Sequence, residues 1–206
     1  MLFRSRAVDG RDAHGPGAAL LHDALVPLAV VEGHPEGDED ADPDPVSAEP
    51  AAPHLLVAGG AGFIGSCYVR DVLARGDGTR ITVLDKLTYA GTEANLASVR
   101  ADPAQAARLT FVRGDIADAA LVSPLVAAAD AVVNFAAETH VDRSLLDAAP
   151  FLRTGVLGLH VLLEAVRVET ERVGAGSRER APRLVQVSTD EAYGAVERSE
   201  EHTSEL

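Results

Sequence analysis

The stretch GGAGFIGS at residues 59–66 decides the fold. An apolar run at residues 54–59 leads into it, and a helix-like stretch at residues 62–75 follows. Gly59, Gly62 and Gly65 have the spacing of a dinucleotide-binding loop. In such a loop one glycine allows the tight turn, another lets the backbone approach a pyrophosphate, and the third permits close helix–strand packing. The N–H groups of the following helix then face the phosphates.

Alternation of apolar runs and helix-like stretches extends from this loop along the chain. The apolar runs cover residues 54–59, 81–85, 109–113, 130–136 and 184–188, and each has the length and hydrophobicity of a strand covered on both faces. Helix-like stretches lie between them at residues 62–75, 92–101, 116–128 and 150–171. This order predicts an α/β fold, a Rossmann-like doubly wound parallel sheet.

The charge of the chain is concentrated outside this region. The 206 residues include 18 Lys+Arg and 32 Asp+Glu, a net charge of −14, which disfavours nucleic acid or an anionic membrane as a partner. Residues 1–53 carry −8 (3 − 11) and residues 198–206 carry −2 (1 − 3), which leaves −4 for residues 54–197. We therefore expect residues 1–53 to be a disordered or non-native extension.

The compartment can be inferred from two further features. Cys67 is the only cysteine, so no internal disulfide is possible, and the protein fits a reducing compartment. The apolar run at residues 18–31 is interrupted by His22, Asp23 and Pro27, so it is too short to span a membrane. We expect a cytoplasmic protein.

Asp85 ends the second apolar run, 20 residues after Gly65. A carboxylate at this position accepts hydrogen bonds from the adenosine ribose hydroxyls and repels a 2′-phosphate, so it favours NAD over NADP. Lys86 either contacts the cofactor or faces water. Asp115 and Ile116 follow the third run, where they either contact adenine or form an ordinary turn.

Polar residues also follow the fourth and fifth apolar runs, at residues 136–144 and 188–194. Ligands of open α/β sheets bind beyond the carboxyl ends of the strands. The adjacent Asp190 and Glu191 could supply an acid and a base, or could form an exposed acidic turn. His140 is read as a structural residue, and no metal-ligand spacing is present, so no metal is expected. The residues alone indicate an NAD-binding α/β enzyme.

Four strings together resemble the dTDP-glucose 4,6-dehydratase family, a member of the NAD-dependent epimerase/dehydratase group of extended short-chain dehydrogenases/reductases. They are GGAGFIGS at 59–66, DKLTYAG at 85–91, AAETHVDRS at 136–144 and STDEAYG at 188–194. The glycine loop is shared across the superfamily, whereas DKLTYAG and the Thr-Asp-Glu triplet are more specific. The resemblance covers residues 54–197, which it implies to be an incomplete NAD-binding Rossmann domain whose sheet is truncated after about the fifth strand.

The resemblance implies a lyase that converts dTDP-glucose to dTDP-4-keto-6-deoxyglucose, for deoxysugar or rhamnose synthesis. Hydride passes from C4 of the sugar to NAD⁺ and returns to C6. Glu191 matches the base that removes the C5 proton, Asp190 matches the acid that protonates the leaving C6 hydroxyl, and Thr139 and Thr189 match substrate contacts. A homodimer is implied for the full-length protein. The positions that match cofactor contacts are Phe63, Ile64, Asp85, Lys86, Leu87, Thr88, Asp115, Ile116, Phe135, Ala136, Ala137 and Thr154.

The chain departs from the family pattern at several places. Thr139 stands where Ser is usual, and Gly155 follows Thr154 where Asn is expected. The family's catalytic Tyr-x-x-x-Lys is missing, because none of the three tyrosines has Lys four residues later. We therefore expect this chain to be inactive by itself. Residues 198–206 resemble a translated sequencing adapter, and we expect them to be an artefact.

Two alternatives remain open at this stage. One is a related sugar-nucleotide dehydratase or epimerase, and the other is a non-catalytic NAD-binding fragment.

Overall fold

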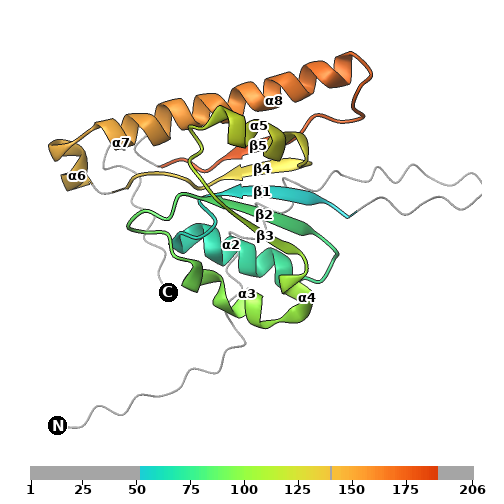
Figure 1. Cartoon of the computed structure of the whole chain (residues 1–206), viewed down its shortest axis with the longest axis horizontal. Coiled ribbons are helices and arrows are strands. Elements are labelled where there is room, and N and C mark those ends of the chain that lie inside the picture. Colours follow the sequence, from blue (N-terminus) through green and yellow to red (C-terminus); the bar gives the residue numbers. More distant parts are fainter. Residues whose placement is uncertain (1–51, 140, 190–206) are drawn as a thin grey trace, which may run out of the picture.

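A five-stranded, fully parallel sheet forms the centre of the computed structural model, which describes residues 52–139 and 141–189 (Figure 1). The strands lie in the order β3-β2-β1-β4-β5. Their bounds are β1 His54–Ala58, β2 Arg80–Asp85, β3 Leu109–Arg113, β4 Ala131–Asn134 and β5 Arg183–Gln186. Ala58 is in register with Leu84 and Asn134, so the carboxyl ends of β1, β2 and β4 meet at one edge. The predicted Rossmann-like sheet is confirmed.

Helices cover both faces of this sheet (Figure 1). One layer contains α2 Phe63–Ala74, the 3₁₀ turn η1 Glu93–Leu96, α3 Ala97–Ala101 and α4 Pro103–Ala106. The other layer contains α5 Ala119–Ala127 and α8 Leu159–Gly174. Strand alternation sends Leu55 and Val57 of β1 into the core beneath α2, and Leu56 and Ala58 into the core beneath α5 and α8.

The three central strands are buried more deeply than the two edge strands. β1, β2 and β4 are almost entirely buried, whereas β3 and β5 keep half-buried and exposed positions. Both edge strands are still covered on both faces, because Phe111 and Val185 pack against one core and Val112 and Leu184 against the other. Within the described residues β3 and β5 have one neighbouring strand each, so one flank of each stays open.

Short polar side chains fix where several helices begin. Asp118 accepts hydrogen bonds from the N–H groups of Ala120 and Leu121, so α5 starts at Ala119 and not at residue 116 as predicted. Asp102 caps α4 in the same way, with Pro103 in the first turn. We did not predict α4 from the sequence, because four residues are too few to show a helical apolar pattern.

The predicted helix at residues 150–171 is one continuous helical stretch with a local change of geometry. It runs through α7 Ala149–Leu152, the π-helical η2 Arg153–Gly158 and α8. The stretch is long and apolar enough to pass for a membrane span, a weak criterion that core helices also satisfy. Its inner face buries Val161, Leu162 and Ala165 against the sheet core. The short α6, Val141–Leu146, was not predicted.

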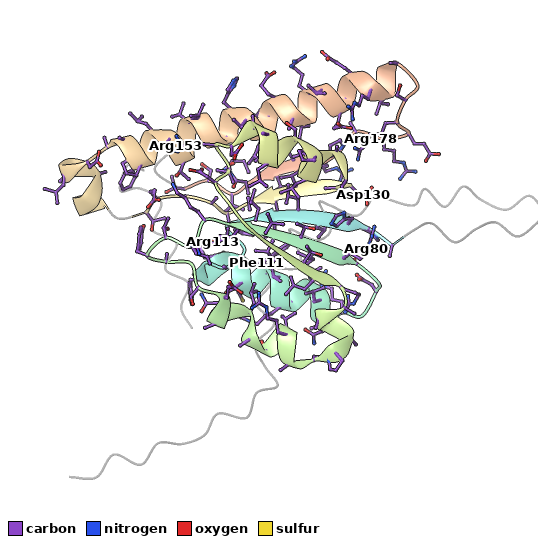
Figure 2. The ribbon with its side chains drawn as sticks, in the orientation of Figure 1. Arg80, Phe111, Arg113, Asp130, Arg153 and Arg178 are labelled. Atoms are coloured by element: carbon purple, nitrogen blue, oxygen red, sulfur yellow. The ribbon has the colours of Figure 1, made fainter. Side chains whose placement is uncertain are left out.

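An arginine braces the edge of the sheet where the strands begin. Arg178 donates through Nη1 to the carbonyl of Ala127 (2.7 Å) and to Glu169 (3.0 Å), and through Nη2 to the carbonyl of Ala129 (2.6 Å). It thereby joins the end of α5, the buried carboxylate of α8 and the segment before β5. Figure 2 shows Arg178 and Asp130 at this end, opposite the end where Arg113 closes β3.

The expected extension at residues 1–53 falls outside the described residues except for its last two positions, and residues 198–206 lie outside them as well.

Two glycines of η2 give a matched test of this packing. A Cβ at Gly155 would meet nothing within 4 Å, whereas a Cβ at Gly158 would lie 2.5 Å from Cγ1 and Cδ1 of Ile116. Gly155→Ala should raise the free energy of unfolding by about 0.5–1 kcal/mol. Gly158→Ala should lower it by about 1–3 kcal/mol because Ile116 has to move. Urea unfolding of both variants decides the point, and equal effects would contradict this packing.

Candidate functional site

A cleft with about 530 Å³ of empty volume lies at the carboxyl edge of the sheet, among the loops that follow β1 to β4. Eleven residues predicted as cofactor contacts line it: Gly59, Gly62, Asp85, Lys86, Thr88, Asp115, Ile116, Phe135, Ala136, Ala137 and Thr154. The remaining lining residues are Leu84, Ala90, Gly91, Gly114 and Glu138, which sequence reasoning did not single out.

The glycine loop forms one wall of the cleft, and its geometry excludes side chains at two positions. Gly59 has φ +73°, and a Cβ there would lie 2.6 Å from the backbone nitrogen of Ala136. A Cβ at Gly65 would lie 2.2 Å from the carbonyl oxygen of Gly59. Both obstacles are backbone atoms, which cannot rotate away as a side chain could. The loop can therefore close against β4 and α2 only with glycine at these positions.

The first turn of α2 is open toward solvent. Its N-cap Gly62 supplies no side-chain hydrogen bond, and the turn contains no acidic residue. The first N–H groups of a helix lack partners within the helix and attract anions. Phe63 and Ile64 are 88% and 62% exposed, and neither lines the cleft. At this start of the helix, Gly62 is the residue that lines the cleft, and it carries no side chain.

Asp85 closes the other side of the loop and is only 8% exposed. Its Oδ2 accepts a hydrogen bond from the N–H of Ala61 (2.9 Å), and its Oδ1 accepts one from the N–H of Leu87 (2.8 Å). A carboxylate oxygen has two acceptor positions, so each oxygen retains one for another donor. A Cβ at Gly91 would lie 2.6 Å from Oδ1, so the last glycine of the DKLTYAG string leaves room for this carboxylate.

Leu87 and Gly65 support the cleft without lining it. Leu87 has φ +56°, an uncommon backbone conformation for leucine, and its N–H is held by Asp85. Gly65 is buried beneath the loop.

One carboxylate oxygen of Asp115 forms ion pairs with two cationic side chains. Its Oδ2 lies 3.0 Å from Lys86 Nζ and 3.0 Å from Arg153 Nε, and its Oδ1 accepts from the N–H of Ala117 at 2.9 Å. Burial by itself raises the pKa of this carboxyl, but the Ala117 N–H, Arg153 and Lys86 together lower the pKa to about 2. Asp115 is thus ionised at neutral pH. Figure 2 shows Arg153 in the N-terminal part of the helical stretch, toward the carboxyl ends of the strands.

Phe135 is backed by an aromatic residue from α2. The rings of Phe135 and Tyr68 have centroids 5.4 Å apart and are tilted by 48°. Burial raises the pKa of Tyr68 to about 12, so its phenol is neutral at physiological pH. The pair fixes the apolar floor of the cleft beside β4.

The ends of β4 and β5 are joined by Asn134. Its Nδ2 donates to Gln186 Oε1 (2.7 Å), and its Oδ1 accepts from the N–H of Ala136 (3.0 Å). Two predicted substrate contacts, Thr139 and Thr189, follow these strands and are exposed. Thr139 donates its N–H to the hydroxyl oxygen of Tyr89 (3.2 Å), which links the loop after β2 to the loop after β4.

The two predicted catalytic residues, Asp190 and Glu191, lie outside the described residues.

The predictions from the sequence did not include Tyr89, Gly91, Asn134 and Arg153, which line the cleft or hold the loops around it. The DKLTYAG string contains the first two, so a signal for them existed. Arg153 meets Asp115 across 38 residues of sequence, and nothing local marks that contact.

Comparison with known proteins agrees with this geometry. A family model described as GDP-mannose 4,6 dehydratase matches residues 56–205. The dTDP-glucose 4,6-dehydratase of Streptomyces niveus is 52% identical over 147 residues, which cover 69% of this chain and 39% of the relative. The chain thus spans about two fifths of the length of that curated relative.

Solved structures show the same relationship. The dTDP-glucose 4,6-dehydratase DesIV of Streptomyces venezuelae, solved with NAD bound, has 49% identity and a TM-score of 0.57, and the match covers 70% of this chain and 42% of that one. The UDP-glucose 4-epimerase of Brucella ovis, in complex with NAD, has 31% identity and a TM-score of 0.53, covering 72% and 39%. These matches confirm the resemblance inferred from the four strings. The chain belongs to the GDP-mannose 4,6-dehydratase family.

Proposed function

We propose that residues 54–197 bind NAD in the cleft and that the protein to which they belong is a dTDP-glucose 4,6-dehydratase. The observation that carries the cofactor proposal is the buried Asp85 carboxylate, which faces the cleft beside the glycine loop. Its two remaining acceptor positions suit the two hydroxyls of a ribose, and its charge opposes a 2′-phosphate.

The residues present fit such a cofactor. A Cβ would collide with backbone at Gly59 and Gly65, so the loop is a cradle that only glycine leaves open. The uncapped first turn of α2 supplies N–H groups to a pyrophosphate. Asp115, ionised and lining the cleft, can accept a hydrogen bond from the adenine amino group. The ribose, the phosphates and the base thus each have a complementary group.

Sequence identity to known enzymes supports dTDP-glucose as the substrate. The chain is 52% identical to a dTDP-glucose 4,6-dehydratase and 31% identical to a UDP-glucose 4-epimerase. The STDEAYG string also contains the Asp-Glu pair that an elimination needs and an epimerisation does not. These observations favour dehydration of dTDP-glucose over the epimerase alternative.

In this proposal NAD, when bound, supplies the hydride acceptor and donor. Thr139 and Thr189 hold sugar hydroxyls beyond the ends of β4 and β5. Glu191 removes the C5 proton, and Asp190 protonates the C6 hydroxyl as it leaves. Lys86, the only lysine of the chain, is paired with Asp115 and has no tyrosine four residues before it. The chain as written therefore lacks a group to take the C4 hydroxyl proton.

The proposal includes a homodimer and a cytoplasmic location. On the side of the helical stretch away from its buried residues, Val156 and Leu163, seven residues apart, are exposed by 64% and 50%. The inner side of the same stretch is the buried one. A second copy of this helical face would cover these apolar side chains. The reducing compartment indicated by the single cysteine suits the cytoplasm.

Cofactor binding is tested by calorimetric titration of the chain with NAD and with NADP. NAD should bind at least tenfold more tightly, about 1.4 kcal/mol, because Asp85 opposes the 2′-phosphate. Asp85→Asn should weaken the binding of NAD at least tenfold and should reduce the ratio between the affinities for NAD and for NADP. Asp71→Asn, which alters an ion pair with Arg75 on α2, is the control. Equal affinity of the chain for NAD and NADP would contradict the proposal.

Turnover is the second test. The chain, incubated with NAD⁺ and dTDP-glucose, should form no 4-keto-6-deoxy product detectable by chromatography, since no Tyr-x-x-x-Lys is present. Formation of that product would overturn this expectation. The longer protein that contains this chain should act on dTDP-glucose in preference to UDP- and GDP-glucose. Equal rates on all three would contradict the proposed substrate.

Association is the third test. Light scattering after size-exclusion chromatography should give twice the chain mass. Leu163→Glu should convert the dimer to a monomer, because a charge would be placed in an apolar interface. Leu145→Glu is the control, since Leu145 is 81% exposed on α6, away from this face. A monomeric chain at all concentrations would refute the proposed interface.

A further inference from the structure

The backbone of Ala61, in the middle of the glycine loop, is held through both its N–H group and its carbonyl group. Its N–H donates to Asp85, as described above. Its carbonyl oxygen accepts from Asn95 Nδ2 at 2.8 Å and from the N–H of Thr92 at 3.1 Å. Ala61 itself is fully buried. The tip of the loop therefore cannot move without breaking contacts to β2 and to η1.

Asn95 is in turn fixed by α2. Arg70 Nη1 donates to the carbonyl oxygen of Asn95 at 2.9 Å and to Ser66 Oγ at 3.2 Å, and Ser66 Oγ donates to the carbonyl of Phe63 at 3.1 Å. Asn95 is half-buried, and the next residue, Leu96, is fully buried in the core beneath α2. The side chain that reaches Ala61 thus projects from an anchored turn.

We propose that Asn95 is a positioning residue for the pyrophosphate of the cofactor, acting through the carbonyl of Ala61. Two independent features support this role. The Asn95 amide is the only side-chain donor that reaches this carbonyl within the described residues. The same anchored turn is tied, through Arg70 and Ser66, to the first turn of α2, which directly follows the cleft-lining Gly62.

The inference rests on the proposed cofactor and adds a residue to it. Asn95 is not among the residues that line the cleft, so its effect on a ligand is indirect. Its loss should loosen the tip of the loop while leaving Asp85, Asp115 and the adenosine end of the cleft in place. The affinity for ligands that contain a pyrophosphate should fall, and the affinity for ligands without one should stay unchanged.

The variants Asn95→Ala and Asn95→Asp separate positioning from general stability. Asn95→Ala removes the donor, and Asn95→Asp replaces it with an acceptor that faces the Ala61 carbonyl. Glu93→Gln is the matched control, because Glu93 lies in the same 3₁₀ turn and pairs with Arg100 and not with the loop. Calorimetry should use the full chain with NAD, ADP and adenosine.

Both Asn95 variants should bind NAD and ADP about tenfold more weakly than the unchanged chain, the loss expected for one hydrogen bond. Their adenosine affinity should stay within about twofold. For Asn95→Asp the loss should shrink from pH 7.5 to pH 5, relative to the unchanged chain, because protonation of the introduced carboxyl restores a donor. Equal losses for ADP and adenosine, or unchanged NAD binding, would overturn the proposal.

Amide hydrogen exchange in the free chain gives a second measurement that needs no ligand. Asn95→Ala should speed exchange of the Ala61 N–H, and Glu93→Gln should not. If the unchanged chain failed to bind NAD, the proposed function would fail. Exchange at Ala61 would then still decide whether Asn95 holds the loop, and unchanged exchange would reject that role.

Discussion

The hydrogen bond between the Asp85 carboxylate and the N–H of Ala61 is the interaction on which the site depends. It connects the end of β2 to the loop after β1, 24 residues earlier, and lies at the edge where the parallel strands end. Because Asp85 is buried, breaking this bond would leave a charge with fewer partners in a poorly solvated place. The same carboxylate lines the cleft, so in the proposed function one side chain would serve both loop stability and ligand recognition.

The two edges of the sheet are built differently. At the edge where strands begin, Arg178 and Glu169 join α5, α8 and the approach to β5 in a compact set of contacts. At the carboxyl edge, contacts run between loops: Asp85 to Ala61, Asp115 to Lys86 and Arg153, and Tyr89 to Thr139. The first set holds the scaffold. The second set shapes the cleft, which is why binding residues gather there.

Much of this arrangement was predictable from sequence, because its causes are local. Apolar runs predicted the strands, glycine spacing predicted the loop, and the position of Asp85 at the end of its strand predicted its place beside that loop. The first residues of helices were predicted less well. The hydrogen bonds from Asp118 make α5 begin at Ala119, three residues after the start that the apolar pattern indicated. Contacts such as Arg153 with Asp115 and Asn95 with Ala61 join segments far apart in the chain. No local pattern encodes them, so only the folded structure reveals them.

The central claim is that Asp85 holds the loop and the ribose at the same time. A crystal structure of the chain with NAD is the most direct measurement. The account predicts the adenosine ribose hydroxyls on Asp85, with Oδ2 still within hydrogen-bond distance of the Ala61 N–H. NAD seated elsewhere, or an Asp85 carboxylate turned away from Ala61 to reach the ribose, would contradict it.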